Sequence, residues 1–201
     1  MLDAVDLECE RGGRKLFRRL SFSLGAGEAL RIAGANGSGK TSLLRILCGL
    51  AAPAAGEVRW KGESVRALRE DYSAQLVYLG HAPAVKDELR ASENLSIACR
   101  LAGNARGRDE VSAALRTLAV PEAAPVKTLS QGQRRRAALA RLLLSQSVPL
   151  WLLDEPLAAL DAQAARLLEG LIAEHTGRGG MVVYTTHQDT HIAGRVISLD
   201  A

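Results

Sequence analysis

The feature that most constrains this chain is a glycine-rich stretch, GANGSGKT, that runs from Gly34 to Thr41. It matches the pattern G-x-x-x-x-G-K-[ST], in which glycines let successive backbone N–H groups surround phosphate oxygens. An apolar run, ALRIA, precedes it, and leucines at helical spacing follow it. A strand, a glycine-rich loop and a helix in that order predict a phosphate loop, with the positive end of the helix dipole at the phosphates.

Two side chains at the end of this stretch have specific chemistry. Lys40 is expected to reach the β- and γ-phosphates of a nucleoside triphosphate, and the hydroxyl of Thr41 is expected to bind Mg²⁺. The rest of the loop is expected to contact the nucleotide through its backbone. The predicted nucleotide-binding residues here are Gly34, Ala35, Asn36, Gly37, Ser38, Gly39, Lys40, Thr41 and Ser42.

Segments with strand patterns alternate with helical segments along most of the chain. The expected strands are residues 2–7, 21–24 and 28–33, followed by GEVRW, QLVYLG, PLWLLDEP, MVVYTTH and RVISLD. Helices are expected after the phosphate loop, ending near Gly49 and Pro53, and over residues 161–175. Residues from about 92 to 145 show helical periodicity alone, which predicts a helical insertion. The alternation predicts an α/β fold with a largely parallel sheet covered on both faces.

Composition restricts where such a chain can work. The 26 basic and 22 acidic residues give a net charge of +4, which fits a basic face for phosphates, nucleic acid or an anionic membrane. A solvated, arginine-rich surface is the interpretation we favour. Three well-separated cysteines without a CxxC pair fit a reducing compartment and exclude a cysteine-rich zinc site. No apolar stretch approaches the roughly 18 residues of a spanning helix, and the start lacks a signal-peptide pattern, so we expect a cytoplasmic protein.

A second apolar strand ends in two acidic residues. The stretch LWLLDEP places Asp154 and Glu155 directly after four apolar residues. A buried strand would bring Asp154 beside the phosphate loop to hold Mg²⁺, and Glu155 would face an attacking water as general base. The alternative is an acidic pair on the surface at the end of a strand. The phosphate loop in the same chain favours the functional interpretation.

The stretch LSQGQ, residues 129–133, opens a long helical segment. A serine and a glycine at the start of a helix form a second anion site. At this point the sequence resembles the ATP-binding-cassette (ABC) ATPases, whose signature motif is usually LSGGQ, with Gln131 in place of one glycine. The order of phosphate loop, signature, acidic strand, Asp161 and His187 resembles the whole ABC nucleotide-binding domain and covers essentially the entire chain.

The resemblance implies a fold and an assembly. We expect a P-loop NTPase core of the ABC ATPase type, with an N-terminal antiparallel β subdomain and an α-helical subdomain inserted at about 88–146. Residues 1–201 would form a single nucleotide-binding domain. In this family one copy does not fold its signature onto its own phosphate loop. Two copies are therefore expected to pack head to tail, with ATP and Mg²⁺ in each seam.

The resemblance also assigns roles to single residues. His187 would be catalytic together with Glu155, bonding the γ-phosphate and orienting the water, while Thr41 and Asp154 would be the metal ligands. Asp161 would communicate across the dimer seam. The signature residues expected to contact the partner's nucleotide are Ser130, Gly132 and Gln133.

Other polar residues match no motif position. His175 and His191 are expected to be solvated. The arginine triplet at 134–136 could touch the nucleotide seam, but we favour a solvated helix face for it.

The chain departs from the ABC pattern at two places. Where the family has a glutamine that touches Mg²⁺ or the water, after the strand that precedes the helical insertion, this chain has His81. We expect His81 at the nucleotide site, where it could still hydrogen-bond a water, although its charge would vary near neutral pH. Where an aromatic residue stacks on adenine, it offers Arg11 or Cys9. Base–aromatic stacking contributes about 1–3 kcal/mol and an exposed arginine over a ring about 0.5–1 kcal/mol, so we expect weaker adenine selectivity.

The string YLGH…K…L…ENL, together with GEVRW and PLWLLDEP, is similar to the ATP-binding subunits of cytochrome c maturation (Ccm) systems, which are haem exporter ATPases. The similarity implies polytopic Ccm membrane subunits as partners, on the cytoplasmic face of a bacterial inner membrane. It also implies that ATP hydrolysis is coupled to haem export or to the release of a haem chaperone.

Two other functions stay open at this point. One is the ATPase subunit of another small ABC exporter, which only the subfamily strings separate from the first. The other is a non-transport ABC ATPase acting on nucleic acid, which the basic charge favours. The absence of a coiled-coil insertion and of a basic tail argues against it, so no nucleic-acid partner is expected.

Overall fold

The computed structural model describes residues 1–199. Its first layer is an antiparallel sheet with strand order β2-β1-β4-β5. These strands are β1 (Leu2–Arg11), β2 (Arg14–Leu24), β4 (Ala55–Trp60) and β5 (Glu63–Ser64). Gly12 and Gly13 join β1 to β2 and both have positive φ, +57° and +75°, as a tight two-residue hairpin requires.

The second layer is a parallel sheet with strand order β6-β7-β8-β3-β9. Its strands are β3 (Ala29–Ala33), β6 (Leu76–Leu79), β7 (Leu150–Leu153), β8 (Met181–Thr185) and β9 (Arg195–Ser198). Every residue of β7 and β8 is buried, as in central strands covered on both faces. The predicted α/β fold with a parallel sheet and an N-terminal antiparallel sheet is confirmed. Asp200, the end of the expected last strand, lies outside the described residues.

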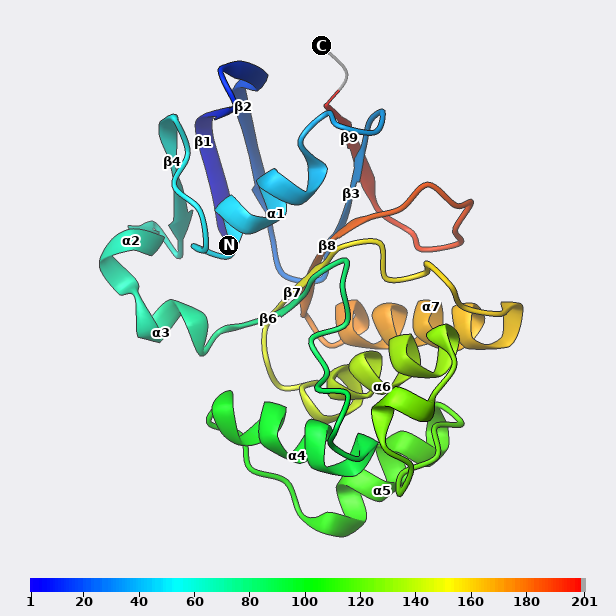
Figure 1. The fold of residues 1–201 in the computed structure, drawn as a ribbon. Helices are drawn as coiled ribbons and strands as arrows, with labels where there is room; N and C mark the ends of the chain where they lie inside the picture. Colours follow the sequence, from blue (N-terminus) through cyan, green and yellow to red (C-terminus); the bar gives the residue numbers. More distant parts are fainter. Residues whose placement is uncertain (200–201) are drawn as a thin grey trace.

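The helices lie between and around these sheets (Figure 1). They are α1 (Lys40–Leu47), α2 (Val65–Leu68), α3 (Glu70–Ser73), α4 (Ala91–Leu101), α5 (Arg108–Thr117), a 3-10 turn η1 (Val126–Thr128), α6 (Gln131–Leu144) and α7 (Ala162–Gly177). In Figure 1, α1 lies between the two sheets, and α4, α5 and α6 gather on the opposite side of the parallel sheet. The four-residue helices α2 and α3 were not predicted, because such short segments have no periodicity to detect. Within residues 1–199, no helix combines the length and the apolar character needed to cross a membrane.

The parallel sheet separates two hydrophobic cores. Leu150 and Leu152 of β7 pack into the core shared with α1 and the antiparallel sheet, whereas Trp151 and Leu153 pack into the core shared with α4 to α7. Successive side chains of a strand point to opposite faces, so each central strand contributes to both cores. Packing on both faces thereby fixes the register of each strand relative to its neighbours. The register in turn sets the positions of the carboxyl ends of the strands.

His175 is buried, so the expectation that it is solvated is wrong. The residue is 3% exposed, and its ring stacks on the indole of Trp151, with centroids 3.8 Å apart and planes inclined by 3°. Burial lowers the pKa of this imidazole, because a charged ring would lose its hydration. The sequence placed it on α7 but gave no sign of an aromatic partner on the neighbouring strand. His191 is exposed, as predicted.

Gly180 leaves the space that this histidine ring occupies, and this yields a stability prediction. A Cβ at Gly180 would lie 2.3 Å from Nε2 of His175. We expect Gly180→Ala to lower the free energy of unfolding by about 1–3 kcal/mol, since the buried ring has to shift. Urea unfolding measures the difference.

Gly177→Ala is the matched control. No heavy atom lies within 4 Å of a Cβ at Gly177, the last residue of α7, so this change should leave the stability unchanged or raise it. Equal losses in both variants would contradict the packing explanation.

Candidate functional site

A cavity of about 790 Å³ opens at the carboxyl edge of the parallel sheet. Strands β7, β8 and β3 are neighbours, and at their carboxyl ends begin Asp154, the segment to His187 and the phosphate loop. The lining includes these sequence-predicted residues: Arg11, Asn36, Gly37, Gly39, Lys40, Thr41, Ser42, His81, Asp154, Glu155 and His187. The fold thus brings together in one place residues that are far apart in the sequence.

The phosphate loop has the backbone that its glycines permit. Gly37 and Gly39 have φ of +83° and +105°. A Cβ at Gly39 would also lie 3.1 Å from Cβ of Leu16 and 3.2 Å from the ring of Phe17. Gly39 caps α1 without any side-chain hydrogen bond, and the first turn of α1 contains no acidic residue. The N–H groups of that turn are therefore available to an anion.

Lys40 is a buried cation that faces the loop's own carbonyls. Its side chain is 8% exposed, and Nζ donates to Gly34 O at 2.8 Å and to Ala35 O at 3.0 Å. Among residues 1–199, no carboxylate lies within ion-pair distance of this ammonium group. A buried charge with only neutral partners fits a site that receives an anionic ligand.

Asp154 lies at the centre of a hydrogen-bond network between three elements. It is 1% exposed; Oδ2 accepts from the Thr41 hydroxyl at 2.8 Å and Oδ1 accepts from the Thr185 hydroxyl at 2.9 Å. The Thr185 hydroxyl in turn accepts from the backbone N–H of Glu155 at 2.8 Å. Sequence reasoning missed Thr185; the only available signal was its place at the end of a strand that runs beside the acidic one.

This donor set fits Mg²⁺ bound with a phosphate. A hydroxyl and a carboxylate oxygen, from Thr41 and Asp154, are the hard oxygen ligands that Mg²⁺ prefers. Within residues 1–199, no group of three or more His, Cys, Asp or Glu side chains could hold a metal by themselves. Mg²⁺ typically takes one or two protein ligands and completes its octahedron with water and substrate phosphate, which agrees with this arrangement.

Glu155 and His187 face each other across the cavity. Nε2 of His187 lies 3.5 Å from Oε1 of Glu155, and the backbone N–H of His187 donates to Oε2 at 3.3 Å. The Glu155 side chain is 14% exposed, and its Oε1 is buried and accepts no hydrogen bond from residues 1–199, so this oxygen has an unused acceptor. Glu155 also has a φ of +49°, a conformation that costs a non-glycine residue energy and that the Thr185 hydrogen bond to its N–H helps to hold.

The two departures from the ABC pattern fall on the same cavity. His81 is exposed and contributes to the lining. Of the two residues expected in place of the adenine-stacking aromatic, Arg11 lines the cavity, whereas Cys9 is buried in the core. The aromatic ring of nearby Phe17 is also buried, packed over Gly39. Of these candidates, Arg11 is therefore the one exposed to a base.

The predicted signature residues lie outside this cavity and cap helices. The Ser130 hydroxyl accepts from the backbone N–H of Gln133, and Oε1 of Gln133 accepts from the N–H of Ser130, which together cap α6. Asp161 caps α7 by accepting from the N–H of Ala164. Gly132 lies close to the loop between β7 and α7, since a Cβ at Gly132 would lie 3.0 Å from Ala159 O. Within one chain, these residues are not brought to the phosphate loop.

The solvated face expected for the arginine triplet is wrong for its middle member. Arg135 is 4% exposed, whereas Arg134 pairs with Asp87 at 2.9 Å and Arg136 pairs with Asp161 at 3.4 Å. Successive residues of a helix point in directions about 100° apart, so the three arginines do not share one face. Arg135 lies on the buried stripe of α6, and that stripe was the available signal.

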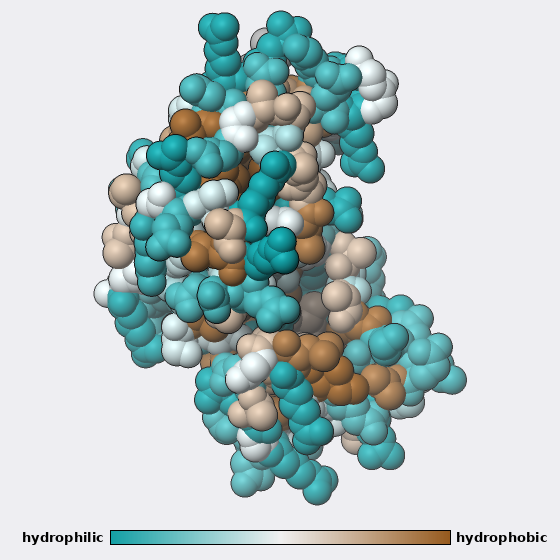
Figure 2. All heavy atoms as spheres, turned by 90° about the vertical axis from the view of Figure 1, so that its left-hand side faces the viewer, coloured by the Kyte–Doolittle hydropathy of each residue, from teal (hydrophilic) through white to brown (hydrophobic). Residues whose placement is uncertain are grey.

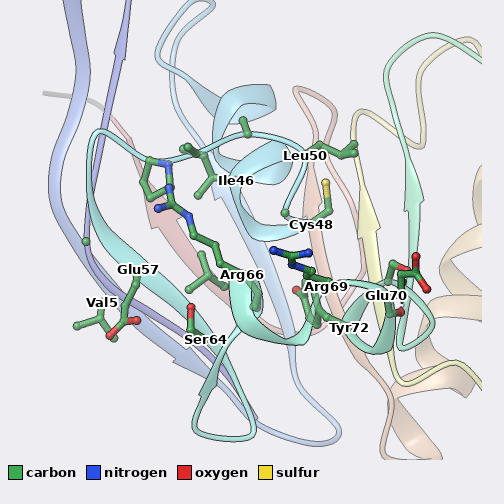
Figure 3. A pocket seen from close by; sticks show the side chains of 18 of the residues that line it. Val5, Ile46, Cys48, Leu50, Glu57, Ser64, Arg66, Arg69, Glu70 and Tyr72 are labelled. Atoms are coloured by element: carbon green, nitrogen blue, oxygen red, sulfur yellow. Dashed lines mark hydrogen bonds between the residues drawn. The ribbon is translucent and has the colours of Figure 1, made fainter.

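A larger cavity, of about 1010 Å³, lies at the carboxyl end of α1 and contains none of the predicted site residues. Figure 3 shows that Arg66 and Arg69, from α2 and the residue after it, reach toward the loop that follows α1. Their charges are accompanied by the acidic side chains of Glu57 and Glu70 in the lining. This cavity is thus of mixed charge and is distinct from the phosphate-loop site.

Comparisons with known proteins agree on a family. The ABC transporter family pattern matches residues 17–158. The chain is 52% identical to the cytochrome c biogenesis ATP-binding export protein CcmA of Nitrosospira multiformis, over 98% of this chain and 96% of that one. It is 49% identical to the protein of the same name from Pseudomonas aeruginosa, over 94% of each.

Solved structures share the fold. The dimeric structure of MJ0796, a bacterial ABC transporter cassette, matches with a TM-score of 0.85 and 24% identity, covering 100% of this chain and 94% of that one. A putative ABC transporter ATP-binding protein from Pyrococcus furiosus matches with a TM-score of 0.83 and 22% identity, covering 98% and 96%.

The network around Asp154 yields a prediction for Thr185. Thr185→Val keeps the shape of the side chain but removes the hydroxyl that donates to Asp154 and accepts from the Glu155 N–H. We expect Mg²⁺-dependent nucleotide hydrolysis to fall by about 10- to 100-fold, as when a residue that orients a metal ligand is changed. Steady-state phosphate release measures it.

Thr176→Val is the control, because the Thr176 hydroxyl bonds only carbonyls of its own helix, Ile172 O and Ala173 O. Its activity should equal that of the wild type. Equal activity of Thr185→Val and wild type would refute the orienting role.

Proposed function

This chain belongs to the ABC transporter family and is the ATP-hydrolysing subunit of such a transporter, and from this we propose its cellular role. We propose that it couples ATP hydrolysis to haem export, or to release of a haem-loaded chaperone, in cytochrome c biogenesis. The observation that carries the proposal is the 52% identity over nearly the full length to a cytochrome c biogenesis ATP-binding export protein. Another small exporter would not account for that identity, and a nucleic-acid function is supported by net charge alone.

The catalytic roles follow from the cavity. Lys40 and the first turn of α1 would bind the phosphates, and Mg²⁺ on Thr41 and Asp154 would neutralise charge that develops on them. Glu155 would accept a proton from the attacking water. His187 would hold that water and the γ-phosphate, a role supported by the 3.5 Å separation between its Nε2 and Oε1 of Glu155.

A second copy of the chain is the proposed partner at the nucleotide. Ser130, Gly132, Gln133 and Asp161 lie outside the cavity of their own chain, so a head-to-tail copy would present them to the phosphates. A cassette of the same fold has been solved as a dimer, which supports this arrangement. Each ATP would then be held by the phosphate loop of one copy and the signature of the other.

Membrane partners account for the rest of the proposed function. The chain would act as a peripheral subunit at the cytoplasmic face of a bacterial inner membrane, bound to polytopic Ccm subunits, which would supply the spanning helices. Figure 2 shows several apolar side chains on the face that carries β4 and α2. Leu50, which follows α1, and Leu101, at the end of α4, are 66% and 85% exposed, so contacts with other subunits would cover them.

Glu155→Gln tests the assignment of the base. The amide keeps the shape but cannot accept the proton, so we expect turnover to fall by about 10²- to 10⁴-fold. ATP binding should persist, because Lys40 and Thr41 are unchanged; the shift in unfolding temperature on adding ATP measures it.

Glu174→Gln, a change at an exposed residue paired with Arg178, should hydrolyse ATP like the wild type. Undiminished turnover in Glu155→Gln would mean that another group activates the water.

Deleting the gene tests the cellular function. We expect holo-cytochromes c to disappear while other haem proteins persist, as haem staining of membrane fractions would show. The wild-type chain should restore them, whereas Lys40→Ala should not, because it lacks the buried cation of the phosphate loop. Persistence of holo-cytochromes c in the deletion strain would reject the role in cytochrome c biogenesis and leave the ATPase assignment intact.

A further inference from the structure

Arg135 is a buried cation that bonds the backbone of the catalytic residues. It lies on α6, five residues after Ser130, and is 4% exposed. No ion pair to its guanidinium is found among residues 1–199. Its hydrogen bonds go instead to four main-chain carbonyls on two neighbouring strand ends.

Each terminal nitrogen of the guanidinium bonds the two carbonyls that follow one strand. Nη1 donates to Gly80 O at 3.0 Å and to His81 O at 3.2 Å, just after β6. Nη2 donates to Asp154 O at 2.8 Å and to Glu155 O at 2.6 Å, just after β7. Four of the five N–H groups of the guanidinium are thus used, and only the planar fork of arginine has donors spaced to do so.

The Arg135 guanidinium links β6 and β7 just beyond the last backbone hydrogen bond between them. The last backbone bond between β6 and β7 runs from the N–H of Asp154 to Leu79 O. After this bond, the segment that follows β6 carries His81 and the segment that follows β7 carries Glu155, and both residues line the cavity. Arg135 is therefore a direct link between these two cavity-lining segments.

This link is electrostatically unfavourable in itself. Burial lowers the pKa of Arg135, and the nearby charges of Asp154 and Glu155 only partly oppose that shift. Its Nε is also buried, and no group in the described part of the chain, residues 1–199, bonds it. Filling the same space with an apolar side chain such as methionine would avoid the cost of desolvating a charge. Position 135 therefore requires the forked arrangement of N–H donors on arginine and not merely a side chain of that volume.

We propose that Arg135 is a positioning residue that holds Glu155 and His81 at a fixed separation and couples them to the signature helix. The proposal rests on the proposed function, in which Ser130 contacts the nucleotide of the partner copy. Ser130 and Arg135 are about 7.5 Å apart along the axis of α6, at 1.5 Å per residue. A shift of α6 caused by the partner's ATP therefore moves the carbonyls of this chain's own catalytic acids, so that the two ATP sites act together.

Steady-state kinetics of Arg135→Lys and Arg135→Gln test the proposal. Lysine keeps the charge but not the fork, and glutamine keeps a planar donor group but lacks the charge. We expect kcat to fall by about 10- to 100-fold, because a small displacement of a catalytic group has effects of this size. KM for ATP should stay unchanged, since Lys40 and Thr41 are untouched, and the Hill coefficient for ATP should fall from its wild-type value toward one.

Arg141→Gln is the matched control on the same helix. Burial also lowers the pKa of Arg141, but within residues 1–199 no hydrogen bond or ion pair joins it to the catalytic segments, so kcat and the Hill coefficient should equal those of the wild type. Wild-type kcat and Hill coefficient in Arg135→Lys would overturn the proposal. So would a loss of kcat that merely follows the loss of folded protein in both Arg135 variants, as circular dichroism would show, since a purely structural role predicts that result.

Ser130→Ala separates this proposal from the one on which it rests. If Ser130→Ala leaves hydrolysis intact and the wild type has a Hill coefficient of one, the head-to-tail arrangement fails and the coupling fails with it. If Ser130→Ala abolishes hydrolysis while Arg135→Lys keeps the kcat and Hill coefficient of the wild type, the head-to-tail arrangement stands and only the role of Arg135 is overturned.

Discussion

The carboxylate of Asp154 is the constraint on which the rest of the site depends. It is buried, so each of its oxygens needs a hydrogen-bond donor, and the donors come from two different elements, Thr41 of α1 and Thr185 of β8. The hydrogen bonds to the Asp154 carboxylate therefore hold α1, the helix that follows the phosphate loop, against the ends of β7 and β8. The same contacts orient Glu155, whose N–H is bonded by the Thr185 hydroxyl. Fold stability and catalytic geometry rest on the same few hydrogen bonds.

Much of this arrangement was predictable, because the phosphate loop and the acidic strand each combine a local motif with the element that carries it. Strand and helix patterns around Lys40 and Asp154 placed both at the ends of parallel strands. What the sequence did not reveal depends on contacts between distant elements. Thr185, Arg135 and His175 look ordinary in isolation, and their partners are a carboxylate on the next strand, carbonyls of two strand ends and an indole ring. Periodicity predicts which face a residue occupies, not which group it meets there.

The helix starts show that the site is built for a ligand that the chain does not contain. The starts of α6 and α7 are capped by the side chains of Ser130 and Asp161, whereas α1 begins at Gly39 with no side-chain cap. Beside it lies the ammonium group of Lys40, bonded only to carbonyls. Positive charge and free N–H groups are thus concentrated at one point, which favours a polyanion over any neutral ligand.

The same helix starts bear on the proposed pairing of two copies. Ser130 caps its own helix through its hydroxyl oxygen and is exposed, so its hydroxyl proton is available to an acceptor from outside the chain. The cavity around Lys40 lies at a different place on the surface, and its lining does not include Ser130. In the proposed pair, a second chain would cover a triphosphate bound there with its own α6. Because Arg135 joins that helix to the strand ends that carry Asp154 and Glu155, closing one seam would also act on the other.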